Sequence, residues 1–248
     1  MTALKDQAAE ALDRVGLLPT ARRIKHRFFP NPYYQRIARD DRAILLILDM
    51  VLREDSNCID VGAHAGDVLS AMLRLAPLGR HMAWEPLPHL AGRLQTRFPT
   101  VDVRRAALSD HSGEEEFVFV TSNPGQSGLR LRTHDQHEEI ERIRVNVESL
   151  DDSIPAGYVP ALIKIDVEGA EGEVLRGAKN TIVNHRPVVV FEHGVGGADR
   201  YGTTSDELFQ LLVQEAGMRI FDMDGVGPYS RSDFSAAFEA PMWNWVAR

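Results

Sequence analysis

The chain of 248 residues has a single cysteine, Cys58, so no disulfide can form within it. Such sparse use of cysteine is typical of a reducing compartment. The sequence also lacks a long apolar run, because its most hydrophobic stretch, residues 43–52, is broken by Asp49 and is too short to cross a bilayer. The first residues lack the basic start and apolar core of a signal peptide. We therefore expect a cytoplasmic protein.

Composition and length predict one globular core. Hydrophobic residues make up 44% of the chain and charged residues 26%, which are usual values for a globular protein. A length of 248 residues fits one α/β domain with a short addition. We expect an N-terminal helical extension over residues 1–55 and a core domain over residues 56–248.

Charge is distributed unevenly along the chain. Residues 1–55 contain 10 Lys+Arg and 8 Asp+Glu, whereas the remainder contains 18 and 28. Eight cations lie between Arg14 and Arg42, and four aromatic residues lie among them. Such a run is either a solvated helix face or a surface for an anionic substrate group or a membrane. The acidic remainder argues against nucleic acid as a partner.

Apolar periodicity predicts strands and helices in alternation from residue 58 onward. The expected strands are 58–61, 82–85, 101–103, 116–120, 143–147, 161–166, 187–192, 219–221 and 242–246. The expected helices are 4–15, 37–52, 68–76, 90–98, 170–178 and 208–216. Strands that alternate with helices form a mostly parallel sheet with right-handed crossovers. The predicted fold class is therefore α/β.

The most informative stretch is residues 58–67, in which a strand passes through a Gly-x-x-x-Gly turn into a helix. Such a turn brings backbone N–H groups close to a ligand. Asp60 ends the strand and Asp67 opens the helix, so the turn forms a negatively charged cradle for a ligand. Such a cradle disfavours a pyrophosphate. A cationic ligand fits better, which points to S-adenosylmethionine rather than NAD. An ordinary strand-to-helix turn is the simpler interpretation.

Glu85 supports the nucleotide interpretation. It ends the second predicted strand, 19 residues after Gly66. An acid about 20 residues after a glycine turn binds ribose hydroxyls in α/β nucleotide folds. The alternative interpretation is a solvated strand end.

Ionisable residues also follow two later strands. Asp166 and Glu168 follow one strand, and Glu192 and His193 lie at the end of the next. Parallel strands present their carboxyl ends at one edge of a sheet, so these side chains should converge. His193 is the predicted catalytic base because histidine titrates near neutral pH, and Asp166 and Glu192 are further catalytic candidates. Asp166, Glu168 and Glu192 could instead bind Mg²⁺, and acids in this position also cap helices.

The polar segment 121–141 is long for a plain connection. We interpret it either as a lid over the crevice or as a surface loop. It contains His134 and His137, whose spacing on its own is a weak indication of a metal site.

Several motifs together resemble the FkbM-type methyltransferases. They are IDVGAHAGD (59–67), WEP (84–86), ALSD (107–110), SLDD (149–152), IKIDVEGAE (163–171), RP (186–187) and FEH (191–193). The likeness covers about residues 57–195, with His64 where the family usually has asparagine and Trp84 where it usually has phenylalanine. The resemblance implies a Rossmann-like class I methyltransferase fold with helices on both faces of the sheet. It also implies S-adenosylmethionine as the cofactor and methyl transfer to a hydroxyl of a sugar, glycolipid or secondary metabolite.

The same resemblance, together with the cradle, assigns a set of cofactor-binding residues, of which residues 107–110 would lie beside the adenine. The set is Asp60, Gly62, Ala63, His64, Gly66, Glu85, Pro86, Ala107, Leu108, Asp110 and Asp166. The acceptor would be a small molecule or a glycolipid, and the basic extension could contact a membrane. Two other functions stay open. One is a module that binds S-adenosylmethionine without catalysis, and the other is an NAD-dependent oxidoreductase, which the acidic cradle and the missing third glycine disfavour.

Overall fold

The computed structural model describes residues 32–122, 125, 127–130, 139–240 and 244–248. The predicted helix 4–15, the cations from Arg14 to Arg27, and His134 and His137 lie outside the described residues. The chain divides into two units, Met1–Arg42 and Ala43–Arg248, and the division falls within helix α3 (Pro32–Val51). The domain boundary expected after residue 55 stays a prediction.

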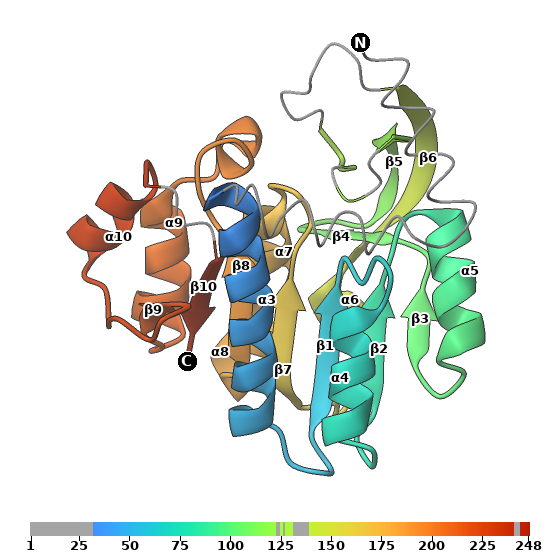
Figure 1. The fold of residues 1–248 in the computed structure, drawn as a ribbon, viewed down its shortest axis with the longest axis horizontal. Helices are drawn as coiled ribbons and strands as arrows, with labels where there is room; N and C mark the ends of the chain where they lie inside the picture. Colours follow the sequence, from blue (N-terminus) through green and yellow to red (C-terminus); the bar gives the residue numbers. More distant parts are fainter. Residues whose placement is uncertain (1–31, 123–124, 126, 131–138, 241–243) are drawn as a thin grey trace. The chain divides into compact units, whose positions relative to one another are not determined.

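The larger unit is built on a seven-stranded sheet (Figure 1). Its order is β3 (Asp102–Arg104), β2 (His81–Trp84), β1 (Asn57–Val61), β7 (Pro160–Ile165), β8 (Val188–Glu192), β10 (Asn244–Ala247) and β9 (Ile220–Asp222). The first five strands are parallel, and β10 runs antiparallel to both of its neighbours. The predicted, mostly parallel sheet is therefore confirmed.

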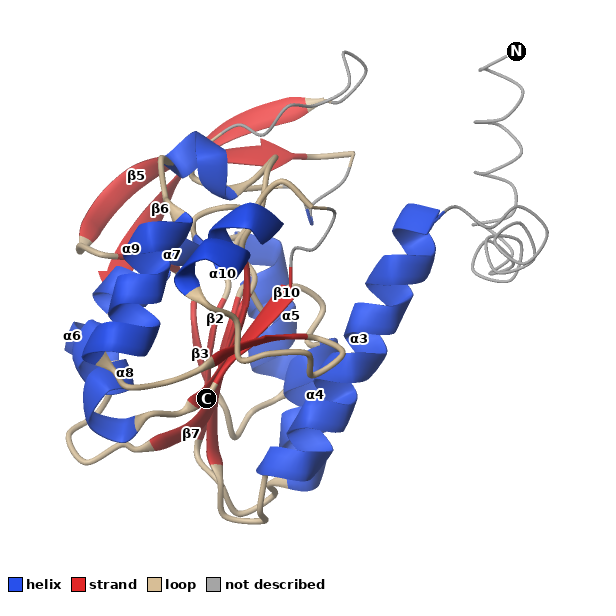
Figure 2. Ribbon diagram, turned by 90° about the vertical axis from the view of Figure 1, so that its left-hand side faces the viewer, coloured by secondary structure: helices blue, strands red, loops and turns tan. Residues whose placement is uncertain are grey.

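Helices cover both faces of this sheet, because parallel strands buried on both sides need two apolar layers. On one face, α4 (Asp67–Leu75) and α5 (Pro88–Arg97) pack with the Ala43–Val51 part of α3. On the other face lie α7 (Glu171–Gly177), α8 (Lys179–His185), α9 (Ser205–Phe209), the π-helical turn Gln210–Glu215 and α10 (Arg231–Ala237). Figure 2 shows the sheet between α4 and these helices. The predicted fold class is confirmed, although α8 and α10 were not predicted.

A second, three-stranded sheet has the order β4 (Ala107–Ser109), β6 (Ile140–Ser149) and β5 (Gly113–Val120). The predicted strands 116–120 and 143–147 lie inside β5 and β6, whereas β4 was not predicted. The short helix α6 (Leu150–Ser153) follows β6, and the 3-10 turn Ala198–Tyr201 follows β8. Within the part of the chain that the structure describes, no helix combines the length and the apolar character that crossing a bilayer requires.

Two turns at the carboxyl edge of the main sheet depend on glycine. Gly62 has φ +74°, and a Cβ atom there would lie 1.9 Å from the carbonyl oxygen of Asp166. Gly169 has φ +112°, and its Cβ would lie 2.6 Å from the carbonyl oxygen of Gly197. Each glycine therefore lets two backbone segments touch directly. The contacts join the turn after β1 to the end of β7, and the turn after β7 to the segment after β8.

We expect Gly62→Ala to lower the free energy of unfolding by more than about 2 kcal/mol, because the substitution meets both a strained φ and a backbone clash. Gly92→Ala is the matched control, since Gly92 lies in α5 with no atom within 4 Å of the added Cβ. That change should stabilise the protein by about 0.5–1 kcal/mol through helix propensity. Urea unfolding of both variants measures the two effects, and equal stability would refute the assignment of Gly62 to a strained contact.

Candidate functional site

The carboxyl ends of β1, β2, β7 and β8 bring most of the predicted strand-end acids to one edge of the sheet. Asp60 and Lys164 occupy paired positions on β1 and β7. Glu85 directly follows β2, Asp166 directly follows β7, and Glu192 is the last residue of β8. This edge is where open α/β sheets bind their ligands.

Lys164 holds this edge together. Its Nζ lies 3.4 Å from Asp60 Oδ1 and 3.4 Å from Asp166 Oδ2, and it donates a 3.1 Å hydrogen bond to the carbonyl oxygen of Gly62. Burial alone would lower the pKa of Lys164, but the charges of Asp166 and Asp60 raise it above its usual value. Lys164 therefore remains a cation between two carboxylates.

We expected the Asp60 carboxylate to face the ligand in the cradle, and the structure places it elsewhere. Its side chain is buried beneath the turn and is paired with Lys164. Burial raises its pKa, although Lys164 acts in the opposite direction. The structure thus gives Asp60 a role in holding β1 to β7, and a direct contact with a cofactor stays a prediction.

The turn after β1 is braced by Glu85. One carboxylate oxygen, Oε2, accepts a 2.9 Å hydrogen bond from the His64 N–H, and Oε1 accepts one of 2.9 Å from the Leu87 N–H. Burial raises the pKa of Glu85, while these two N–H groups oppose the rise. Each oxygen keeps a lone pair that could accept a ribose hydroxyl. Glu85 is therefore fixed in position by its own backbone contacts.

His64 has a left-handed backbone with φ 46°. Asparagine and histidine both tolerate this region better than most residues, so His64 can replace the asparagine usual in such motifs without reshaping the turn. Its side chain is exposed, whereas Ala63 is buried. Gly66 also has a positive φ, of +80°, and lies against Leu94 and Phe98. The glycines of this turn are thus explained by backbone shape and packing, and closeness to a ligand stays a prediction.

The stretch predicted to lie beside the adenine belongs to β4 and its end. Ala107 and Leu108 are buried. Asp110 Oδ2 accepts a 2.8 Å hydrogen bond from Arg176 Nε, and Oδ1 lies 3.1 Å from His111 Nδ1. The Arg176 contact ties the end of β4 to α7. The roles of Ala107, Leu108, Asp110 and the half-buried Pro86 in cofactor binding stay predictions.

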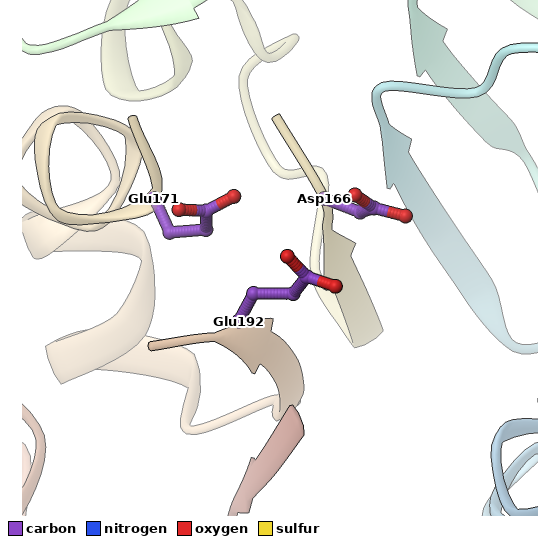
Figure 3. Close-up of side chains that lie close together, drawn as sticks. All are labelled: Asp166, Glu171 and Glu192. Atoms are coloured by element: carbon purple, nitrogen blue, oxygen red, sulfur yellow. The ribbon is translucent and has the colours of Figure 1, made fainter. Parts of the chain in front are cut away.

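Three carboxylates gather beyond β7 and β8 (Figure 3). Asp166, Glu171 and Glu192 each place one carboxylate oxygen within 4.8 Å of the other two. The sequence-based set for a metal was Asp166, Glu168 and Glu192, and the structure brings Glu171 into the cluster rather than Glu168. The reason is the turn itself, in which Glu168 has φ 62° and Gly169 has φ 112°. Two successive left-handed residues reverse the chain and return Glu171 toward the strand end.

Glu171 is the member of the cluster that sequence reasoning missed. It is almost fully buried, and its Oε1 accepts hydrogen bonds of 2.9 Å and 3.1 Å from the N–H groups of Val167 and Gly169. Burial raises its pKa to about 7, with a further contribution from the charge of Asp166. The acid two residues after the glycine of a strand-to-helix turn was the signal that could have identified it.

His193 lies deeper than its predicted role as a base requires. Its Nε2 lies 2.8 Å from Ser205 Oγ, and its ring packs on Phe234 and Phe238. Its Nδ1 is buried and has no hydrogen-bond partner among the described residues. Burial lowers the pKa of His193 to about 4, so the ring is neutral at pH 7. The base role of His193 stays a prediction.

A small open hollow adjoins the carboxylates. Its walls are mostly backbone and short side chains, and they are formed by Gly169, Glu171, Glu192, His193, Gly194, Val195, Gly197 and Ala198. Two acids and several glycines give this hollow a polar, negatively charged wall. The hollow lies at the sheet edge where the predicted acceptor would meet the cofactor.

The described part of the predicted lid is anchored beside this edge. The Arg130 N–H donates a 2.8 Å hydrogen bond to the Tyr201 hydroxyl oxygen, and Arg130 Nη1 donates one of 2.9 Å to the carbonyl oxygen of Arg200. Arg130 Nη2 also lies 3.6 Å from Glu173 Oε1. Residues 127–130 therefore form a fixed wall, whereas a lid over the whole of 121–141 stays a prediction.

Comparison with known proteins finds similarity to methyltransferases. The profile of the Methyltransferase FkbM domain matches residues 60–220. The protein "Methyltransferase 1" of Beauveria bassiana (strain ARSEF 2860) is 28% identical over 148 residues, which are 50% of this chain and 59% of that protein. The protein "2-O-methyltransferase NoeI" of Sinorhizobium fredii (strain NBRC 101917 / NGR234) is 27% identical over 157 residues, which are 56% of this chain and 64% of that protein.

The chain thus spans about three fifths of the length of these two relatives. Among solved structures, the crystal structure of Methyltransferase FkbM from Methylobacillus flagellatus KT aligns with a TM-score of 0.49 at 15% identity. That alignment covers 79% of this chain and 44% of the other.

We expect Glu85→Gln to weaken the binding of S-adenosylmethionine by about one to two orders of magnitude, because it removes the charged acceptor for the ribose hydroxyls. Glu148→Gln is the control, since Glu148 is another partly buried carboxylate that accepts a hydrogen bond, from Trp84 Nε1. The control should bind normally, and NAD should bind to neither protein. Calorimetric titration makes the measurement, and unchanged affinity in Glu85→Gln would exclude Glu85 from the cofactor site.

His193 and Glu171 should give stability opposite dependences on pH. The pKa of His193 is lowered, so its contribution is present above the unfolded pKa of about 6.5 and is lost as pH falls toward 4. The pKa of Glu171 is raised, so its contribution is present below the unfolded pKa of about 4.3 and is lost as pH rises toward 7. We expect His193→Asn to destabilise the protein more at pH 8 than at pH 5, by about 2 kcal/mol, and Glu171→Gln to show the reverse.

Urea unfolding of both variants and the wild type at the two pH values measures these differences. The comparison between variants is needed because the two contributions largely cancel in the wild-type protein. A destabilisation independent of pH in either variant would contradict the burial assigned to that residue.

Proposed function

The chain belongs to the FkbM methyltransferase family, as its motifs predict, and from that premise we propose that it transfers a methyl group from S-adenosylmethionine to a hydroxyl oxygen. The observation that carries the proposal is the cluster of Asp166, Glu171 and Glu192 at the edge of the sheet. The acceptor we propose is a sugar, a glycolipid or a hydroxylated secondary metabolite. The name of the Sinorhizobium relative, a 2-O-methyltransferase, supports oxygen as the atom that is methylated.

The cofactor part of the proposal rests on the turn after β1 and on Glu85. Glu85 is held by the N–H groups of His64 and Leu87, so its carboxylate would meet ribose hydroxyls without reorganising. The net negative charge of this edge suits a ligand that carries a sulfonium and an amino group. When bound, S-adenosylmethionine supplies an already activated methyl group.

The acceptor part of the proposal rests on the carboxylate cluster. Carboxylates accept hydrogen bonds from hydroxyls, so Glu171 and Glu192 in the wall of the hollow, with Asp166 close to both, would orient a hydroxylated acceptor. A neutral hydroxyl is a poor nucleophile and needs a base within hydrogen-bond reach. Both Glu171 and His193 line the hollow, and Glu171 fits that task better because its pKa is raised to about 7, whereas burial lowers the pKa of His193 to about 4.

A divalent cation is the second way in which the cluster could activate a hydroxyl. Oxygen ligands suit Mg²⁺, and Asp166, Glu171 and Glu192 would be the residues that hold it. A cation there would oppose the rise in the pKa of Glu171, which burial causes and the charge of Asp166 increases. It would also lower the pKa of an oxygen bound beside it.

The first test is methyl transfer from S-adenosylmethionine that carries a CD3 group. Extracts of small molecules and lipids from cells that lack the gene supply the acceptor. We expect mass spectrometry to find a product that is heavier by the labelled methyl group, and Glu171→Gln to lower its rate of formation by roughly 10²–10⁴. Glu173→Gln is the matched control, because Glu173 is the other acid in the first turn of α7. This variant should lower the rate far less.

Addition of EDTA separates the two ways of activating the hydroxyl. If a cation is required, EDTA abolishes the transfer and Mg²⁺ restores it. Transfer that is insensitive to EDTA leaves Glu171 as the base. Binding of S-adenosylmethionine with no labelled product from any extract would support the module without catalysis and contradict the proposed transfer.

A further inference from the structure

The three-stranded sheet reaches the carboxyl edge of the main sheet through residues 127–130. Figure 1 shows the three-stranded sheet beyond the carboxyl ends of the main strands. Gly128 exchanges two backbone hydrogen bonds with Val118 of β5, of 2.8 Å and 3.1 Å, and Ser127 Oγ accepts one of 3.0 Å from the Val120 N–H. One side of the segment is therefore fixed to β5.

The other side of the segment contacts Tyr201, the last residue of the 3-10 turn that follows β8. Tyr201 is buried, and its hydroxyl oxygen accepts a 2.8 Å hydrogen bond from the Arg130 N–H. Arg130 Cζ lies 4.8 Å from the centroid of the Tyr201 ring. Gly128 is also close, because a Cβ atom added there would lie 3.3 Å from the Tyr201 hydroxyl oxygen. Tyr201 therefore meets both the backbone and the side chain of Arg130.

The turn that carries Tyr201 also belongs to the hollow beside the carboxylates. Gly197 and Ala198 line that hollow. Ala198 and Tyr201 are three residues apart in a 3-10 turn, so their side chains lie on the same side of it. The backbone of Gly197 lies directly against Gly169 in the turn after β7. The segment therefore rests on the main sheet at Gly197 and on residues 127–130 at Tyr201, and both contacts determine where the hollow's wall lies.

We propose that Tyr201 is a positioning residue for the methyl acceptor, and that it acts by holding Gly197 and Ala198 in place through its contact with Arg130. This inference rests on the proposed function. Loss of one hydrogen bond changes an equilibrium about two- to tenfold, so the wall would be in place in a smaller fraction of molecules. Apparent affinity falls with the fraction that is competent to bind. The proposed cofactor site is the turn after β1 with Glu85, so acceptor binding should weaken and cofactor binding should not.

The test is Tyr201→Phe, which removes the hydroxyl and keeps the ring. Transfer of the CD3 group is measured over a dilution series of the extract that yields labelled product. We expect the amount of extract that gives half the maximal rate to rise about three- to tenfold. The dissociation constant of S-adenosylmethionine, measured by calorimetry, should stay within about twofold of the wild type, because sites without shared partners act independently. Arg130→Met, at an exposed position, removes the guanidinium from the same contact and should also raise the half-saturating amount.

Tyr158→Phe is the matched control for a general loss of stability. Tyr158 is also buried, and its hydroxyl donates hydrogen bonds of 3.0 Å and 2.8 Å to the carbonyl oxygens of Cys58 and Arg80, at the amino ends of β1 and β2. This variant should lower the melting temperature at least as much as Tyr201→Phe does, and it should leave the half-saturating amount of extract within about twofold of the wild type.

The outcomes separate this inference from the proposed function. A half-saturating amount that is unchanged in Tyr201→Phe, or that rises equally in Tyr158→Phe, overturns the inference while labelled product from the wild type still supports the proposed function. A weaker affinity of Tyr201→Phe for S-adenosylmethionine also overturns it, because Tyr201 would then act on the cofactor site. Absence of labelled product from the wild type overturns the proposed function and this inference with it.

Discussion

The ion contact on which the rest of the site depends is the one between Lys164 and two acids, Asp60 and Asp166. Burying a lysine ammonium costs free energy unless it is paired with an opposite charge and hydrogen-bonded. Here two carboxylates pair with Lys164, and the Gly62 carbonyl oxygen accepts its hydrogen bond. Because Asp60 belongs to β1 and Asp166 follows β7, the contact joins the two central strands where they end. Removing one partner of such a buried group leaves an uncompensated charge at a cost of about 3–5 kcal/mol. The geometry of the edge is therefore set by a charge balance as well as by packing.

The same balance determines which acids remain available for a ligand. The single positive charge of Lys164 balances one of the two carboxylates that it contacts. Of these two, Asp60 is fully buried. Asp166 is partly exposed, and one of its carboxylate oxygens lies within 4.8 Å of Glu171 and Glu192. Crowded carboxylates raise each other's pKa unless a proton, a cation or a set of hydroxyl donors separates them. Burial raises the pKa of Glu171, and the charge of Asp166 adds to the rise. An edge built in this way favours ligands that donate hydrogen bonds or carry positive charge.

Much of this arrangement could be predicted from the sequence, because it follows from where buried strands end. The strands before Asp60, Glu85, Asp166 and Glu192 are apolar runs of the usual length, and their parallel order follows from the helices between them. The sequence could not predict that Glu171, rather than Glu168, joins the carboxylate cluster, since this depends on two successive residues with positive φ. The depth of His193 was also hidden, because its neighbours Phe234 and Phe238 come from α10 and its end, which lie about 40 residues later in the chain. Local patterns locate strand ends well, and long-range packing decides which side chains reach the surface.

Backbone contacts make the carboxyl edge rigid, and under the proposed function this rigidity would limit where acceptor specificity arises. Gly62 touches the Asp166 carbonyl and Gly169 touches Gly197, with no space for a side chain in either contact. The turn after β1 and the carboxylate cluster therefore cannot change shape without disturbing β1, β7 and β8 together. The walls that side-chain contacts hold in place are the segments outside the sheet, residues 127–130 and 194–201, which Arg130 and Tyr201 join. Side-chain contacts can be exchanged without moving a strand, so a rigid edge for methyl transfer combined with exchangeable walls would allow one fold to serve different acceptors.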